Sequence, residues 1–85
     1  MRVRYHKDFE KKHKKHRSLQ ARIDERIILF MTNPFHPILN NHALTGKYQG
    51  YRSINITGDY RAVYELLDKN NALFVDIDTH SNLYK

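Results

Sequence analysis

The chain has 85 residues, with 15 lysines and arginines, nine aspartates and glutamates, six histidines and no cysteine. This length leads us to expect one small domain over residues 1–85. Without cysteine there are no disulfides or thiolate sites, so any chemistry depends on other polar side chains. No apolar run is long enough to cross a bilayer and no signal peptide is expected, so we expect a cytoplasmic protein with no membrane partner.

The formal net charge is +6 and the pI is near 9.7. Nucleic acid, an acidic protein segment and a membrane surface would each be attracted to such a chain, because binding an anionic polymer releases counterions. Charge alone does not choose among these three classes of partner.

Residues 1–5 alternate in polarity and predict a first strand, with Val3 and Tyr5 on one side. Residues 6–17 are almost continuously charged, and Phe9 is their only strongly apolar residue. We predict a helix here, because Phe9, His13 and His16 fall at i, i+4 and i+7 and share one face.

A second helix is predicted by apolar residues that recur every three to four positions: Leu19, Ile23, Ile27, Phe30 and Met31. Ser18 is its predicted N-cap. The helix should end before Pro34, since the residue preceding a proline is disfavoured in the helical conformation. Residues 34–46 are then predicted to form a loop.

Three further strands are predicted at residues 48–57, 60–67 and 73–79, separated by short turn sequences that favour an antiparallel meander. The predicted fold is therefore α+β, with an N-terminal strand and a helical hairpin packed on one face of a mainly antiparallel sheet of three to four strands. In the last strand the core-facing residues are predicted to be Leu73, Val75 and Ile77. The opposite side is predicted to carry Phe74, Asp76 and Asp78, and to lead to His80.

The residues that could carry chemistry lie at strand ends and in loops, where side chains are accessible on a rigid scaffold. His80 follows the last strand, and His42 lies in a loop that Leu44 anchors. Asp59 and Arg61 lie at a tight turn. Asp59 has an alternative explanation in turn chemistry alone, and Arg61 in an ion pair with Glu65 or with an acidic neighbouring strand.

Histidines also occur at positions 6, 13 and 16, and the spacing of His13 and His16 on a helix can bind metal. The lysines around them would repel a divalent cation, and no acidic or cysteine ligand flanks them. We therefore expect no metal and no cofactor.

Three segments carry a resemblance to a known family. They are residues 41–52, NHALTGKYQGYR, residues 58–64, GDYRAVY, and residues 78–84, DTHSNLY. In this order and spacing they resemble the RelE/ParE superfamily of toxins from type II toxin-antitoxin systems, and are most similar in motif to the YafQ and RelE types. The resemblance implies a RelE-like fold and a small basic enzyme that cuts messenger RNA, usually on the ribosome. It also implies an acidic or partly disordered antitoxin encoded by a neighbouring gene.

The same resemblance implies the site residues. By position, the catalytic residues would be His42, Asp59, Arg61, His80 and Tyr84. The RNA-binding residues would be Lys11, Lys12, Lys14, Lys15, Lys47 and Arg52. Metal-free cleavage needs a base, an acid and a cation near the phosphate, which His42, His80 and Arg61 can supply. Tyr84 would stack on a splayed base or help to orient the phosphate.

The chain departs from the YafQ pattern at two positions in one strand. Asn55 stands where YafQ-type strands carry a histidine, and Ser53 where they carry an aspartate. Asparagine cannot shuttle a proton, so proton transfer would depend on His42 and His80. A weakened or inactive relative that binds RNA or protein is one alternative. A ParE-like toxin directed at gyrase is another, although residues 79–81 argue against it.

Overall fold

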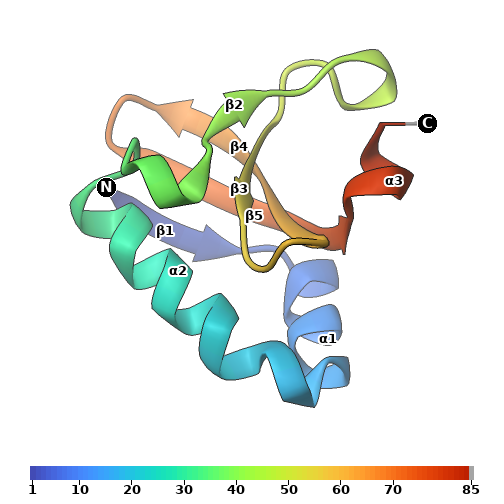
Figure 1. Ribbon diagram of the computed structural model, residues 1–85. Coiled ribbons are helices and arrows are strands. Elements are labelled where there is room, and N and C mark those ends of the chain that lie inside the picture. The colour runs from blue at the N-terminus through green and yellow to red at the C-terminus, as the bar shows by residue number, and fades with distance from the viewer. Residues whose placement is uncertain (85) are drawn as a thin grey trace.

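A five-stranded sheet forms the centre of the protein in the computed structural model, which describes residues 1–84 (Figure 1). The strands are β1 Arg2–Tyr5, β2 His42–Ala43, β3 Arg52–Asn55, β4 Tyr60–Asp68 and β5 Asn71–Thr79. Their order is β1-β5-β4-β3-β2, and only the pairing of β1 with β5 is parallel. The predicted α+β fold is confirmed, with one strand more than expected, because two residues of the predicted loop form β2.

Two long helices cover one face of this sheet. They are α1 Lys7–Lys15 and α2 Gln20–Thr32, whereas the short α3 His80–Leu83 follows β5. In Figure 1, α1 and α2 lie below the sheet, and α3 lies to the right together with the segment between β2 and β3. No helix within residues 1–84 is long and apolar enough to cross a membrane.

The start of α2 differs from the prediction. Ser18 lies inside a 3-10 turn, Arg17–Leu19, and α2 begins at Gln20 without a side-chain cap. The Gln20 side chain instead donates a hydrogen bond to the carbonyl of His13, 2.9 Å away, which ties α2 to the end of α1. The predicted N-cap at Ser18 was therefore wrong, and a side-chain contact between the two helices is found at the start of α2 instead. The end of α2 at Thr32 agrees with the position of Pro34.

The main core lies between the helices and the sheet and is rich in aromatic rings. Phe30 of α2 packs edge-on against Tyr64 and Phe74, at centroid distances of 4.9 and 5.3 Å. Ile23, Ile27 and Phe9 are buried in the same cluster, as the helical periodicity predicted. Met31 is 41% exposed, so its predicted place in the buried stripe was wrong.

A β-bulge in β5 changes which residues face this core. Val63 pairs with Asp76 whereas Tyr64 pairs with Phe74, so Val75 is an additional residue in the ladder. As a result Phe74 and Ile77 both face the helices. The predicted core face was correct for Ile77 but wrong for Leu73, Val75 and Phe74, because the bulge shifts the alternation of side chains along β5.

The predicted strand at 48–57 was too long. Residues Gly46–Tyr48 form a 3-10 turn, and β3 starts only at Arg52. Gly46 and Gly50 have φ angles of 65° and 93°, a conformation that breaks a strand and that glycine adopts easily. The loop between β2 and β3 can therefore fold back over the sheet.

We use the term open face for the side of the sheet that α1 and α2 do not cover. Its small apolar cluster consists of Leu44, Val63 and Leu83, all buried, with Tyr48, Tyr51 and Val75 packed around them. Leu44 comes from the β2–β3 loop and Leu83 from α3. This cluster therefore holds both the loop and α3 against the open face.

Candidate active site

Strand register places polar side chains in two rows on the open face. Asn55, Arg61 and Asp78 are register partners across β3, β4 and β5. Side chains of register partners point to the same side of a sheet. The neighbouring row contains Ser53, Val63 and Asp76, and His42 of β2 is paired with Ser53 at its end. The sheet itself therefore brings His42 to the face that carries Arg61.

The short helix α3 brings His80 to the same face. Thr79 caps α3, its hydroxyl oxygen accepting a hydrogen bond from the amide of Asn82 at 3.3 Å. The His80 amide donates to the carbonyl of Asp59 at 2.8 Å, which fixes the start of α3 beside the β3–β4 turn. Leu83 anchors the other end of the helix in the small apolar cluster.

Tyr84 lies between the two predicted catalytic histidines. Its ring centroid is 6.0 Å from that of His42, with only 13° between the ring planes, and 4.5 Å from that of His80. The Tyr84 hydroxyl is hydrogen-bonded to Nε2 of His42. The structure thus brings His42 next to two residues that lie about half the chain away in sequence.

The protonation of His42 follows from its second hydrogen bond. Nδ1 lies 2.7 Å from the carbonyl oxygen of Asn40, which can only accept. In the neutral imidazole Nδ1 therefore carries the proton, and Nε2 has the free lone pair. His42 presents a hydrogen-bond acceptor to the open face, where the Tyr84 hydroxyl meets it.

Arg61 is 8% exposed and is bound to the protein's own backbone. Its Nη1 donates to the carbonyls of Thr57, Gly58 and Tyr60 at 3.0, 3.2 and 3.2 Å. The ion pair with Glu65 that the sequence left open is not among those formed within residues 1–84. Arg61 therefore holds the turn that carries Asp59 and adds positive charge beneath it.

Asp59 occupies an exposed position in this turn. Its amide donates to the hydroxyl oxygen of Thr57 at 3.2 Å, as does the amide of Tyr60 at 3.0 Å. Turn chemistry thus accounts for the local backbone. The turn also places Asp59 next to His80, which turn chemistry alone does not require.

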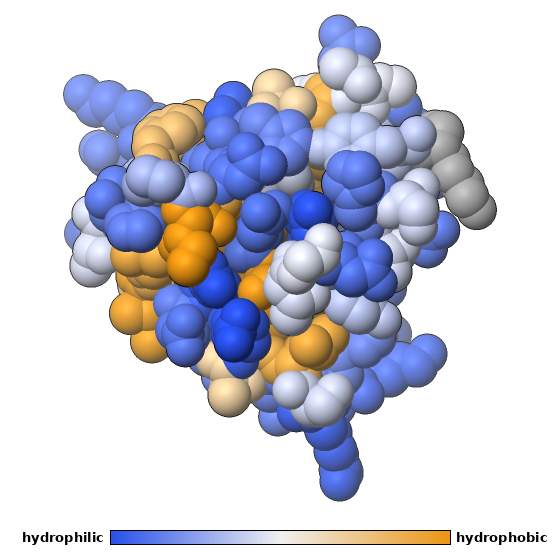
Figure 2. Space-filling view, viewed as in Figure 1, coloured by the Kyte–Doolittle hydropathy of each residue, from blue (hydrophilic) through white to orange (hydrophobic). Residues whose placement is uncertain are grey.

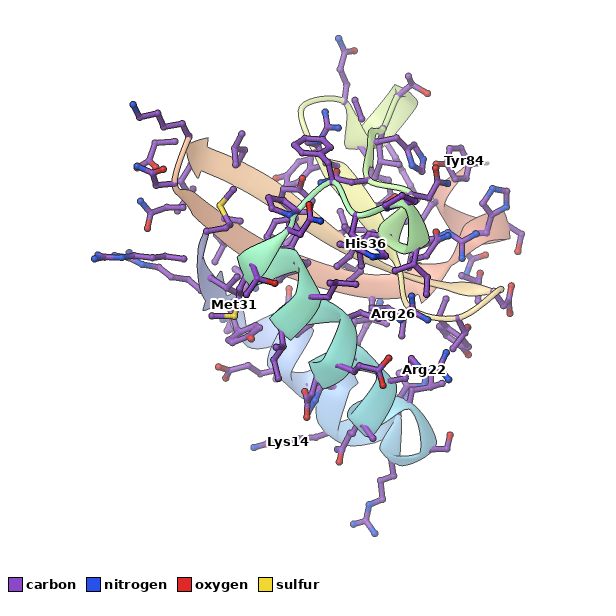
Figure 3. The ribbon with its side chains drawn as sticks, turned by 60° about the vertical axis from the view of Figure 1, so that its left-hand side comes forward. Lys14, Arg22, Arg26, Met31, His36 and Tyr84 are labelled. Carbon is purple, nitrogen blue, oxygen red and sulfur yellow. The ribbon has the colours of Figure 1, made fainter. Side chains whose placement is uncertain are left out.

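The four lysines predicted to bind RNA divide between two surfaces. Lys11, Lys12 and Lys15 line a groove of about 490 Å³ between α1 and β5, on whose floor lies Asp76. Lys14 lines a separate pocket of about 380 Å³ on the other side of α1. In Figure 3, Lys14 lies at the opposite end of the molecule from Tyr84. Only three of the four lysines therefore border the groove beside β5.

Lys12 is already paired within the protein. Its Nζ lies 2.6 Å from Oδ1 of Asp76, whose second oxygen accepts a bond from the Tyr48 hydroxyl at 3.4 Å. Burial lowers the pKa of Lys12, but the hydrogen bond and charge of Asp76 and the charge of Asp78 raise it overall. Lys12 is thus held in its charged form and neutralises a carboxylate on the open face.

Asp78 lies one step further along β5, between this groove and α3. Burial alone would raise the pKa of its carboxyl group. Hydrogen bonds from the side chain of Asn82 and the amide of Thr79, with the charges of Lys12 and Lys47, instead hold this pKa below its ordinary value. Lys47 therefore lies near the open face.

Arg52 points away from the open face. Its Nε donates to Oδ1 of Asn41 at 3.0 Å, and its Cζ lies 5.6 Å from the ring centroid of Phe35. From the sequence, Arg52 was predicted to contact RNA and Asn41 was given no role. The Asn40-Asn41 pair could have indicated a specialised turn before His42, because asparagine tolerates left-handed backbone. Asn40 indeed has a φ angle of 44°.

The histidines of α1 are used within the fold. His13 Nε2 lies 2.8 Å from Asp24, and the His16 ring lies 5.2 Å from that of Tyr60. Within residues 1–84 no group of three histidine or acidic side chains is arranged to hold a metal ion. The surface in Figure 2 is mostly hydrophilic, with separate hydrophobic patches on the left, near the top and in the lower middle of the view.

The five-stranded sheet with two helices on one face is the fold of solved toxin structures, including YafQ and a YoeB/ParE toxin. The family model described as "Bacterial toxin of type II toxin-antitoxin system, YafQ" matches residues 1–85, and the chain belongs to this family. No curated protein sequence matches the chain.

Solved structures share this fold over nearly the whole chain. YafQ from E. coli strain BL21(DE3) is 21% identical, with a TM-score of 0.80 and 100% of both chains covered. A copper-bound mutant toxin from Helicobacter pylori is 25% identical, with a TM-score of 0.75 and 98% of both chains covered. A structure of the E. coli DinJ-YafQ complex gives a TM-score of 0.78 at 21% identity, again with 100% of both chains covered.

Proposed function

We propose that this toxin is a metal-independent endoribonuclease that cuts messenger RNA on the ribosome by using the RNA 2′-hydroxyl. The observation that carries the proposal is the contact of the Tyr84 ring with both His42 and His80 on the open face. Imidazole suits proton transfer near neutral pH, because its ordinary pKa is about 6.5.

In the proposed reaction His42 acts as the base. Its Nε2 takes the proton of the 2′-hydroxyl, which replaces the Tyr84 hydroxyl at that nitrogen. The 2′-oxygen then attacks the adjacent phosphorus, and the bond to the 5′-oxygen breaks as His80 donates a proton to it. The products are a 2′,3′-cyclic phosphate and a free 5′-hydroxyl. Each positioned proton transfer contributes roughly 10²- to 10⁴-fold to the rate.

The surrounding charges fit a phosphate chain. Arg61 adds positive charge under the Asp59 turn, although its Nη1 is bound to carbonyl oxygens, so it acts more as a fixed charge than as a two-pronged clamp. Lys47 lies near Asp78, and the groove lined by Lys11 and Lys15 borders Asp76, two residues before Asp78 on β5. Single-stranded RNA is commonly held by such a basic groove together with an aromatic face, here Tyr84.

The proposed protein partner is a cognate antitoxin. In the solved DinJ-YafQ complex a toxin of this fold is bound to DinJ. The formal charge of +6 favours an acidic segment in the partner of the present chain. We further propose that toxin, antitoxin and ribosome meet in the cytoplasm.

One observation favours a second candidate, a weakened enzyme that still binds RNA. Ser53 is fully buried and its hydroxyl has no hydrogen-bond partner within residues 1–84. The same holds for Oδ1 of Asn55. Neither side chain can transfer a proton as the histidine and aspartate of the YafQ pattern can. The two candidates differ in whether bound RNA is cut.

The test is to induce the protein in cells, map new 5′ ends on messenger RNA, and measure plasmid supercoiling in the same cultures. We expect cuts within translated messages, unchanged supercoiling, and loss of cuts in His42→Ala and His80→Ala. His13→Ala is the matched control, since it removes an imidazole on the other side of α1. Purified toxin at high concentration should cut free single-stranded RNA in the presence of EDTA. On programmed ribosomes kept in Mg²⁺ it should fail on a message with a 2′-deoxy scissile nucleotide.

Full cutting by His80→Ala would refute the assignment of roles. RNA binding without any cutting by the wild type would favour the weakened enzyme. Altered supercoiling without message cleavage would point to gyrase as the target.

A further inference from the structure

Asn41, immediately before His42, is held by three side-chain hydrogen bonds. Its Oδ1 accepts from the hydroxyl of Tyr64 at 2.8 Å and from Nε of Arg52 at 3.0 Å. Its Nδ2 donates to the carbonyl of Pro34 at 2.9 Å. The Tyr64 side chain is 2% exposed and its ring belongs to the main core. Asn41 thus connects the start of β2, where His42 lies, directly to the main core.

The backbone next to Asn41 determines the orientation of the His42 ring. Asn40 adopts a left-handed conformation with a φ angle of 44°, and its carbonyl accepts the Nδ1 hydrogen bond of His42 at 2.7 Å. A shift of residue 41 would turn this peptide and move the acceptor away from Nδ1. Without that acceptor, the neutral ring could place its proton on either nitrogen.

We propose that Asn41, Arg52 and Tyr64 form a brace that fixes the position and the tautomer of His42. They are positioning residues for the reaction, so this inference rests on the proposed function. The brace reaches from the covered face of the sheet around its edge to the open face. It gives Arg52 a role in positioning in place of the RNA contact predicted from sequence.

The surroundings of Arg52 agree with this role. Its Nε is taken up by Asn41, and its Nη2 lies 3.5 Å from the carbonyl oxygen of the same residue. Phe35 lies against the guanidinium group, with 5.6 Å between Cζ and the ring centroid. An arginine whose edge is bonded and whose face is stacked is poorly placed to bind a phosphate in two-pronged geometry.

If this brace is broken, we expect a change in the tautomer ratio of His42, which a loss of folding stability alone would not produce. A neutral hydrogen bond contributes about 0.5–1.5 kcal/mol. Its loss at Nδ1 should therefore change the ratio of the two neutral tautomers of His42 by about 2- to 13-fold. Nε2 would then carry the proton in part of the molecules and could not accept the ribose proton.

The experiment is long-range 1H–15N NMR of the purified full chain labelled with 15N-histidine, recorded at pH 8. In the wild type we expect Nδ1 of His42 to have the shift of a protonated nitrogen and Nε2 that of an unprotonated one. In Asn41→Ala both shifts should move toward intermediate values. Tyr64→Phe removes only the hydroxyl and should move them in the same direction by a smaller amount.

Two variants serve as controls. Asn41→Asp keeps the acceptor for Arg52 and Tyr64 and should retain most of the wild-type shifts. Asn71→Ala removes an asparagine that bonds Asp68 at the β4–β5 turn, and it should leave His42 unchanged. On programmed ribosomes Asn41→Ala should lower kcat about 2- to 10-fold, with KM nearly unchanged, because the groove residues are intact.

The outcomes separate the brace from the proposed function. Unchanged His42 shifts in folded Asn41→Ala would overturn the brace. If Asn41→Ala does not fold, unchanged shifts in Tyr64→Phe would overturn it instead. Shifts that move as expected in a protein whose wild type cuts no RNA would support the brace and refute the nuclease.

Discussion

The two faces of the sheet differ in what their residues do. The covered face is packed against α1 and α2 by a cluster of twelve buried residues, whereas the buried cluster on the open face contains three. Free energy from burial scales with apolar area, so most of the folding stability comes from the covered face. The open face uses its small cluster to hold α3, which begins with His80, and the β2–β3 loop, which follows the strand that carries His42.

Most of the buried side-chain polar atoms without a hydrogen-bond partner within residues 1–84 lie on the open face. They are Ser53 Oγ, Asn55 Oδ1 and Arg61 Nε, whereas Arg26 Nε belongs to α2 on the covered side. Leaving a buried polar group unpaired costs about 1–3 kcal/mol. The comparison teaches that burial on the covered face supplies most of the folding free energy. This surplus allows the open face to keep polar side chains whose burial lowers stability.

The largest expected effect lies on the covered face. Phe74→Ala should lower the free energy of unfolding by about 3–5 kcal/mol, because it removes a fully buried ring that contacts Phe30 and Tyr64. Urea denaturation followed by circular dichroism measures the loss. Val63→Ala, in the small cluster of the open face, is the matched variant and should cost clearly less. An equal cost for both would contradict the division of labour between the faces.

The next effect concerns RNA binding on the open face. Tyr84→Ala should weaken binding of a short single-stranded RNA by about 1–3 kcal/mol, the contribution of stacking on one base, while Tyr84→Phe should retain most of it. Fluorescence anisotropy with a catalytically inactive His80→Ala background measures the change. Tyr5→Ala is the control, since Tyr5 is 44% exposed against 43% for Tyr84 but lies on the other side of the sheet. Similar losses for both tyrosines would place RNA elsewhere.

Much of the fold could be predicted because the spacing of apolar residues along the sequence shows which side of a helix is buried. The stripe from Ile23 to Phe30 fixed the buried side of α2, and the turn sequences fixed the β3–β4 and β4–β5 hairpins. The bulge at Val75 could not be predicted, because it depends on which residues of β4 pair with β5. Ser18 likewise had the chemistry of a cap, but the contact of Gln20 with His13 decided where α2 begins.

The candidate site was predictable in its residue types and less so in its contacts. Motif order pointed to His42, His80 and Tyr84, and the structure brings them together. The backbone bonds of Arg61 and the turning away of Arg52 depend on side-chain geometry that spacing does not encode. The ion pair of Lys12 with Asp76 joins a helix to a strand far away in the sequence, so no local sequence pattern could predict it.

A smaller expected effect, on the salt dependence of RNA affinity, tests which lysines contact the phosphates. Each phosphate neutralised on single-stranded nucleic acid contributes about 0.7 to the slope of log affinity against log salt. The double variant Lys11→Gln with Lys15→Gln should therefore reduce the slope by about 1.4. Lys14→Gln should leave it unchanged, because Lys14 lines the pocket on the other side of α1. An equal change from Lys14→Gln would mean that the whole of α1, rather than the groove beside β5, contacts RNA.

The smallest effect tests whether the open face contributes to the acid sensitivity of the fold. The pKa of Asp78 is held below its ordinary value, so its charged form stabilises the folded state above about pH 4. This contribution is lost as the pH falls through the lowered pKa. Asp78→Asn should therefore reduce stability near pH 6 by less than about 1 kcal/mol, as is usual for a partly exposed charge.

Urea denaturation of wild type and Asp78→Asn at several values between pH 6 and pH 2.5 provides the measurement. The two stabilities should converge at low pH, where the wild-type carboxyl is also neutral. Asp68, in the β4–β5 turn, has its pKa lowered by a hydrogen bond from Asn71, and it contributes to both curves alike. The difference between the curves therefore isolates Asp78. A difference that stays constant with pH would show that Asn82 and the lysines do not stabilise its charged form, and that the open face adds packing but no charge-dependent stability.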